Sequence, residues 1–147
     1  MLNRRSLLLL GLTLPLFGAG VALGDVSRLN PNTASAAQLN GIAGLGSNLA
    51  AAIVAQRPFA NMVEFDKLVR KVLDQRKAEA LYEQLFIPIN LNSASRAEIA
   101  LIPGMSSRMV REFLEYRPYS DIGVFNREIG KYVDDAEVAR LRSYVTL

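Results

Sequence analysis

The stretch Asn30–Ser35 (NPNTAS) returns 60 residues later as Asn90–Ser95 (NLNSAS). The same offset continues without a gap to the last residue, and residues 30–87 and 90–147 are identical at 14 positions. Self-similarity at a fixed spacing indicates a duplicated structural unit. Two copies are too few for a solenoid, so we expect two tandem units that each fold largely on their own.

Both copies have the pattern of short helices separated by turns. Each opens with the S-x-x-E/Q capping box, continues through a glycine turn to a second helix capped by serine, and meets a proline that ends this helix. An Asn or Asp then caps a third helix, and an Asp caps a fourth. The residues concerned are Ser35, Gln38, Gly44, Gly46, Ser47, Pro58, Asn61 and Asp74, and in the second copy Ser95, Glu98, Gly104, Ser107, Pro118, Asp121 and Asp134. The sequence therefore predicts an all-α fold of two tandem units of about 60 residues, each with four short helices in two hairpins.

The first 24 residues have the layout of a secretory signal peptide. Arg4 and Arg5 precede an apolar stretch, Leu7–Phe17, and small residues follow at Ala22 and Gly24. We therefore expect a signal peptide at residues 1–24, the first unit at 25–88 and the second at 89–147, in a protein of the periplasm or an equivalent extracytoplasmic space. The alternative is a retained membrane anchor at residues 7–23, which is short for a bilayer span. Both Sec and twin-arginine export remain open.

Composition restricts the chemistry. The chain has 17 basic and 14 acidic residues, and loss of Arg4 and Arg5 with the signal peptide would leave 15 and 14. Nucleic-acid binding would therefore require that cations gather on one face. Cysteine and histidine are both absent, which rules out disulfides and histidine-based triads and disfavours a zinc site. We expect no catalytic activity, no cofactor and no small-molecule substrate.

Several motifs together resemble one family. The opening Asn-x-Asn-Thr/Ser-Ala-Ser, the Ile-Ala/Pro-Gly-Leu/Met turn and the closing Arg-Pro-aromatic element are similar to the ComEA-type helix-hairpin-helix domain. The resemblance extends over about 118 residues, 30–147, and is closest at Asn90–Pro118. Some members of this family are exported DNA receptors. The PsbU family of extrinsic photosystem II subunits resembles the same fold but caps a protein complex.

The resemblance implies binding of DNA phosphates without sequence preference. A helix N-terminus offers free backbone N–H groups and partial positive charge, glycine allows close approach, and nearby cations add attraction. The candidate DNA-binding residues are Gly44, Leu45, Gly46, Ser47, Lys71, Gly104, Met105, Ser106, Ser107, Arg108 and Arg111. In the second unit Ser106 replaces a glycine, and we expect strain there if the turn needs a left-handed residue.

Each of these features also has a purely structural interpretation. The glycines could only form tight turns, and Arg108 and Arg111 could pair with Glu112 and Glu115 four residues later. The basic stretch of Arg70, Lys71, Arg76 and Lys77 could be a solvated face. Arg57 and Arg117 are expected to bond helix-end carbonyls, and Phe65, Phe113, Tyr116 and Phe125 are expected in the core.

The leading hypothesis is an exported, sequence-independent DNA-binding protein. The alternative is a structural module that docks on a cell-envelope or membrane-complex protein, which the near-neutral charge favours. Arginines gathered beside a turn on a positive face would support DNA. Arginines paired with acids beside an exposed apolar patch would support docking.

Overall fold

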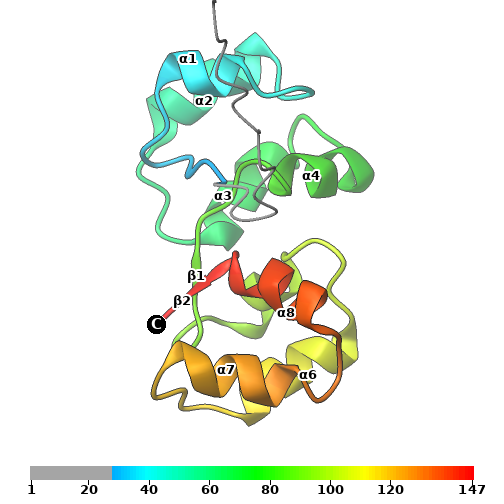
Figure 1. Ribbon diagram of the computed structural model, residues 1–147. Helices are drawn as coiled ribbons and strands as arrows, with labels where there is room; N and C mark the ends of the chain where they lie inside the picture. The colour runs from blue at the N-terminus through cyan, green and yellow to red at the C-terminus, as the bar shows by residue number, and fades with distance from the viewer. Residues whose placement is uncertain (1–27) are drawn as a thin grey trace, which may run out of the picture.

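The computed structural model describes residues 28–147, and this part of the chain is mostly helical (Figure 1). The second four helices begin 60 residues after the first four, in the same order. The predicted helical class is therefore confirmed. The elements of the described residues are α1 (Ala36–Asn40), α2 (Ser47–Gln56), α3 (Met62–Val69), α4 (Gln75–Tyr82), β1 (Ile89–Asn90), α5 (Arg96–Ala100), α6 (Ser107–Glu115), α7 (Ile122–Ile129), α8 (Asp135–Arg142) and β2 (Val145–Thr146).

Side-chain caps fix where seven of the eight helices in residues 28–147 begin. In each, an oxygen of the capping side chain accepts a hydrogen bond from the backbone N–H three residues later. The caps are Ser35, Asn61, Asp74, Ser95, Ser106, Asp121 and Asp134. The capping boxes expected at Ser35 and Ser95 are confirmed. The predicted caps Ser47 and Ser107 are wrong by one residue, because both already lie inside their helices.

The expectation of an all-α fold missed two short parallel pairings. Leu29 pairs with Leu85 in an isolated bridge, and β1 pairs with β2 through Ile89 and Val145. In both cases the segment before a set of four helices joins the segment after it. Strands of one or two residues are too short to show an alternating pattern in the sequence.

The Arg-Pro-aromatic segments are tied to the loops before α1 and α5. Phe59 N–H donates to Asn32 Oδ1 at 2.7 Å, and Arg57 donates to the Ala34 carbonyl at 2.6 Å. Arg117 likewise donates to the carbonyls of Leu91 and Ala94. The expectation that these arginines bond helix-end carbonyls was wrong, since the acceptors lie just before the first helix of each set. The two motifs that recur together in the sequence are thus in contact.

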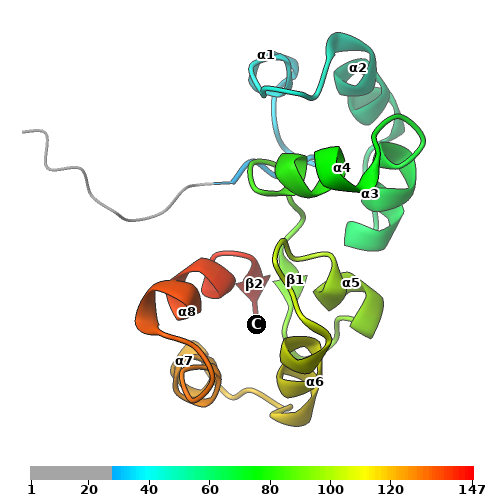
Figure 2. The same ribbon diagram turned by 90° about the vertical axis from the view of Figure 1, so that its right-hand side faces the viewer.

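The apolar side chains form one continuous cluster that spans residues 28–88, here the first half, and 89–147, the second half. The halves lie one above the other in Figures 1 and 2. The Phe86 and Tyr144 rings meet edge to face with centroids 4.9 Å apart, and the Arg28 guanidinium lies 3.4 Å from the Tyr144 ring centroid. The predicted core aromatics are buried, except for half-buried Tyr116; they are Phe65, Phe113 and Phe125.

The predicted signal peptide and the alternative membrane anchor both lie outside the described residues. Among the helices of residues 28–147, none has the length and apolar character required to cross a bilayer.

Candidate nucleic-acid interface

The turn between α1 and α2, residues 42–47, is here called the first turn. Gly44 and Gly46 have φ angles of 82° and 79°, a region that glycine enters at little cost. Leu45 between them is buried and anchors the turn in the core. A Cβ atom added at either glycine would meet nothing within 4 Å. The outer side of the first turn is therefore open.

The first turn leads into the one helix of the described set that has no side-chain cap. Gly46 occupies the cap position of α2, and no side chain accepts a hydrogen bond from the backbone N–H groups at the start of that helix. Among residues 28–147, the backbone N–H groups of Gly46, Ser47, Asn48 and Leu49 have no hydrogen-bond acceptor. Such a cluster of free amides at the positive end of a helix is an anion-binding arrangement.

The turn between α5 and α6, residues 102–107, is here called the second turn, and it is partly covered. Arg140 of α8 donates to the Pro103 carbonyl at 2.8 Å, while its Nη2 lies 3.3 Å from where a Gly104 Cβ would stand. The same guanidinium makes two 2.7 Å bonds to Glu137. In the first half the positions 60 residues earlier are Ala80 and Lys77, so no such cover exists there.

Ser106 also distinguishes the second turn from the first. Its φ of −89° lies in the extended region, so the expected left-handed strain at this serine was wrong. Its hydroxyl accepts from the Met109 N–H at 3.1 Å, whereas the matching amide of Leu49 is free. The second turn thus offers one amide fewer to an anion.

Arg108 and Arg111 are both exposed on α6. The alternative interpretation, in which they pair with Glu112 and Glu115, is contradicted, because neither arginine forms an ion pair within the described residues. Arg108 instead lies 5.2 Å from the Tyr132 ring centroid, and Glu112 is buried. The Tyr132 hydroxyl lies 2.7 Å from the Tyr116 hydroxyl and hydrogen-bonds with it. This bond and a second one with the Glu112 carboxylate raise the pKa of Tyr132.

The densest group of basic residues lies in the segment between α3 and α4 and at the start of α4. This basic turn, residues 70–77, carries Arg70, Lys71, Arg76 and Lys77, all exposed and none in an ion pair among residues 28–147. Three of the matching positions in the second half are Gly130, Ala136 and Glu137. The fourth, Lys131, is paired with Glu128.

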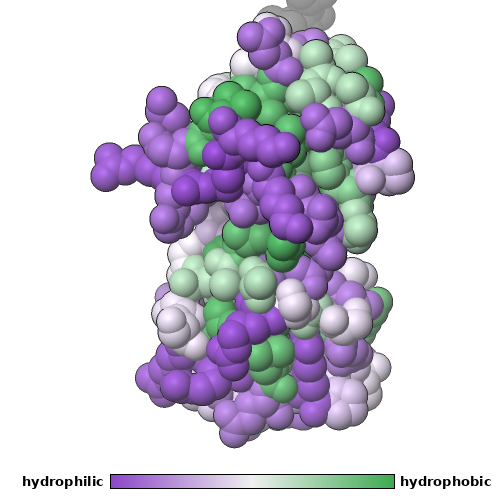
Figure 3. Space-filling model, turned by 180° about the vertical axis from the view of Figure 1, so that it is seen from behind, coloured by the Kyte–Doolittle hydropathy of each residue, from purple (hydrophilic) through white to green (hydrophobic). Residues whose placement is uncertain are grey.

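The first turn and the basic turn both lie on the right-hand side of the upper half in Figure 1. From behind, hydrophilic side chains gather over that half, and a hydrophobic strip lies between the halves (Figure 3). Val72, at the tip of the basic turn, is 63 % exposed. The first turn and the second turn, in contrast, lie in different halves of the chain.

Formal charge follows the same asymmetry. The first half carries seven basic and five acidic residues from 28 to 88, and the second half carries eight of each. The small positive balance expected from composition therefore resides in the first half, which also contains the open turn.

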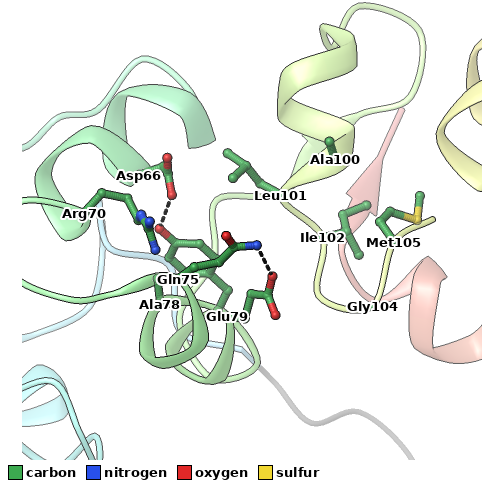
Figure 4. A pocket seen from close by; sticks show the side chains of 11 residues that line it. Asp66, Arg70, Gln75, Ala78, Glu79, Ala100, Leu101, Ile102, Gly104 and Met105 are labelled. Atoms are coloured by element: carbon green, nitrogen blue, oxygen red, sulfur yellow. Dashed lines mark hydrogen bonds between the residues drawn. The ribbon is translucent and has the colours of Figure 1, made fainter. Parts of the chain in front are cut away.

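A cleft of about 320 Å³ lies between the halves (Figure 4). Its polar wall comes from α3, α4 and the basic turn, and its apolar wall comes from α5 and the second turn. The Tyr82 hydroxyl donates to Asp66 at 2.6 Å, and burial followed by this bond raises the pKa of Tyr82. The lining residues are Asp66, Arg70, Gln75, Ala78, Glu79, Tyr82, Ala100, Leu101, Ile102, Gly104 and Met105.

The cleft was not predicted from the sequence. Gln75 and Glu79 were not singled out, although their bond at 3.2 Å places an amide beside a carboxylate. Gly104 and Met105, predicted as phosphate donors, line this cleft with Arg70. No three His, Cys, Asp or Glu side chains in the described part of the chain lie where they could hold a metal ion.

Comparison with known families identifies the motif that contains the first turn and the basic turn. Residues 25–85 match the model of the helix-hairpin-helix motif. The matched range covers α1 to α4 and the turns between them. No curated protein and no solved structure matched the chain. The helix-hairpin-helix motif is consistent with nucleic-acid binding in general.

Proposed function

We propose that this chain binds duplex DNA through its phosphates, without sequence preference, and that the helix-hairpin-helix motif of the first half carries the site. The single observation behind the proposal is the first turn. It joins an open glycine backbone to the uncapped N-terminus of α2, inside the range that matches the motif. Backbone amides that hold phosphates carry no sequence information.

The basic turn supplies the charge that the first turn lacks. α2 has no basic residue, so amides alone would hold a phosphate weakly at cellular salt. The cations of the basic turn, Arg70, Lys71, Arg76 and Lys77, are exposed and unpaired within the described residues. The basic turn lies on the same side of the upper half as the first turn (Figure 1). Lys and Arg that neutralise phosphates release counterions, which gives affinity that falls with salt.

The second half plays a supporting role in this proposal. Its basic and acidic residues are equal in number, and Arg140 covers the second turn. At the positions that match the cations of the basic turn, the second half has either a residue without positive charge or a lysine paired with Glu128. Arg108 and Arg111 remain exposed and add at most peripheral contacts. The 60-residue offset supports an origin by tandem duplication, after which only the first copy kept an open turn.

Further proposals concern context. The ComEA-like opening and the signal-like N-terminus favour an exported, non-enzymatic receptor for DNA in the periplasm or an equivalent space. Docking on a cell-envelope or membrane-complex protein was the alternative, and arginines paired with acids beside an exposed apolar patch would have supported it. Arg108 and Arg111 form no ion pair within residues 28–147, so this support for docking is missing.

Fluorescence anisotropy with labelled blunt duplexes tests the proposal. Two duplexes of unrelated sequence should bind with equal affinity, and both affinities should fall log-linearly with salt. Affinities that differ more than tenfold between the two sequences would contradict phosphate-only recognition. Absence of binding to either duplex at low salt would overturn the proposed function.

A further inference from the structure

The cleft between the halves has two chemically different walls. Leu101, Ile102 and Met105 form an apolar wall, and Figure 4 shows them opposite the polar side chains of α3, α4 and the basic turn. Its volume, about 320 Å³, is at the lower end of the range for small-ligand sites. An occupant must therefore be small, with one apolar face and one polar edge.

The polar wall is rich in acceptors. One oxygen of Asp66 accepts from Tyr82 and one oxygen of Glu79 accepts from Gln75, so the second oxygen of each carboxylate is left for a ligand. Carboxylates accept hydrogen bonds from the amino groups of bases. Of the DNA bases, guanine has two adjacent donors on its Watson–Crick edge, a ring N–H and an amino group, which suits a carboxylate best.

Arg70 connects this cleft to the proposed DNA surface. It lines the cleft and also belongs to the basic turn, beside Lys71. Its guanidinium forms no ion pair with any described acid, so it is free to bind the phosphate of a nucleotide that enters. A strand held by the basic turn would pass the mouth of the cleft.

We propose that the cleft takes one unpaired guanine nucleotide from the end of a DNA strand. The base lies against Leu101 and Met105, its donor edge faces Glu79 and Asp66, and its phosphate pairs with Arg70. A base inside an intact duplex is stacked and paired and does not enter such a site. The inference rests on the proposed function for its partner, but its site is separate from the first turn.

The test compares a blunt duplex with the same duplex carrying a single 3′ overhanging dG or dT, by fluorescence anisotropy at one salt concentration. The dG overhang should bind about tenfold more tightly than the blunt end or the dT overhang, the discrimination typical of a good base contact. Glu79→Gln should abolish the dG preference and keep blunt-duplex affinity. Glu83→Gln, an equal charge change at an exposed site at the end of the same helix, should keep the preference.

Calorimetry with free dGMP and dTMP separates this inference from the proposed function. If dGMP binds and Glu79→Gln weakens it about tenfold, the cleft is a guanine site even if duplex binding fails. If blunt duplex binds but neither the dG overhang nor dGMP shows a preference over its dT counterpart, the inference is overturned and the proposed function stands. If no DNA and no nucleotide binds, both are overturned.

Discussion

Replacement of Gly46 by alanine tests the first turn through both stability and binding. Gly46 has φ 79° and ψ 149°, a region that only glycine occupies readily, and a residue forced there costs on the order of 1–3 kcal/mol. The added Cβ would meet no atom within 4 Å, so backbone strain rather than a clash sets the cost. With a urea m-value of about 2 kcal/mol/M, the unfolding midpoint should fall by about 1 M.

Relief of this strain would also turn the amides of Gly46 and Ser47 away from a shared anion. A hydrogen bond to a charged group contributes about 1.5–3 kcal/mol, so duplex affinity should weaken roughly tenfold to a hundredfold. Gly41→Ala is the matched control, because Gly41 has φ −79° and ordinary space for a Cβ. It should be neutral or slightly stabilising and bind DNA normally. Equal midpoints and equal affinities for the two variants would refute the reasoning.

Two further predictions concern the second half. Arg140→Ala removes the donor to the Pro103 carbonyl and the partner of Glu137, and it should lower the free energy of unfolding by about 1–2 kcal/mol because the site is only half-buried. Arg142→Ala, an exposed change on the same helix, should cost under about 0.5 kcal/mol in urea titrations, and equal losses would contradict the assigned contacts. Burial raises the pKa of Tyr119 to about 12, so folding favours its neutral form. Its contribution to the free energy of unfolding is complete below about pH 10 and is lost between about pH 10 and 12. The urea midpoint should therefore fall less between about pH 10 and 11 in Tyr119→Phe than in the unchanged protein. An unchanged loss would show that Tyr119 does not titrate with folding.

The local signals in the sequence were strong enough to predict most of the helices. Capping boxes and Asn or Asp caps act within four residues, so Ser35, Asn61 and Asp134 mark helix starts that the structure confirms. The caps at Ser47 and Ser107 were misplaced because adjacent residues were both suitable. The short strand pairings join residues more than 50 positions apart, and no local pattern reveals them.

The candidate site was predicted less completely, and the reason is distance in the chain. The glycines of the first turn are visible in the sequence because positive φ requires that residue type. The cover over the second turn depends on Arg140, 37 residues from Pro103. The cleft depends on how α3 and α4 face α5, which motif spacing does not encode.

The most direct test of DNA binding by the first half uses the two lysines that the repeat places at equivalent positions. Lys71 is free of ion pairs among the described residues, whereas Lys131 is paired with Glu128. Duplex affinity is measured by anisotropy from low to moderate salt for the unchanged protein, Lys71→Ala and Lys131→Ala. The account predicts that Lys71→Ala reduces the log–log salt slope by about one and that Lys131→Ala leaves it unchanged. A slope that falls with Lys131→Ala and not with Lys71→Ala would contradict the account and place the DNA on the second half.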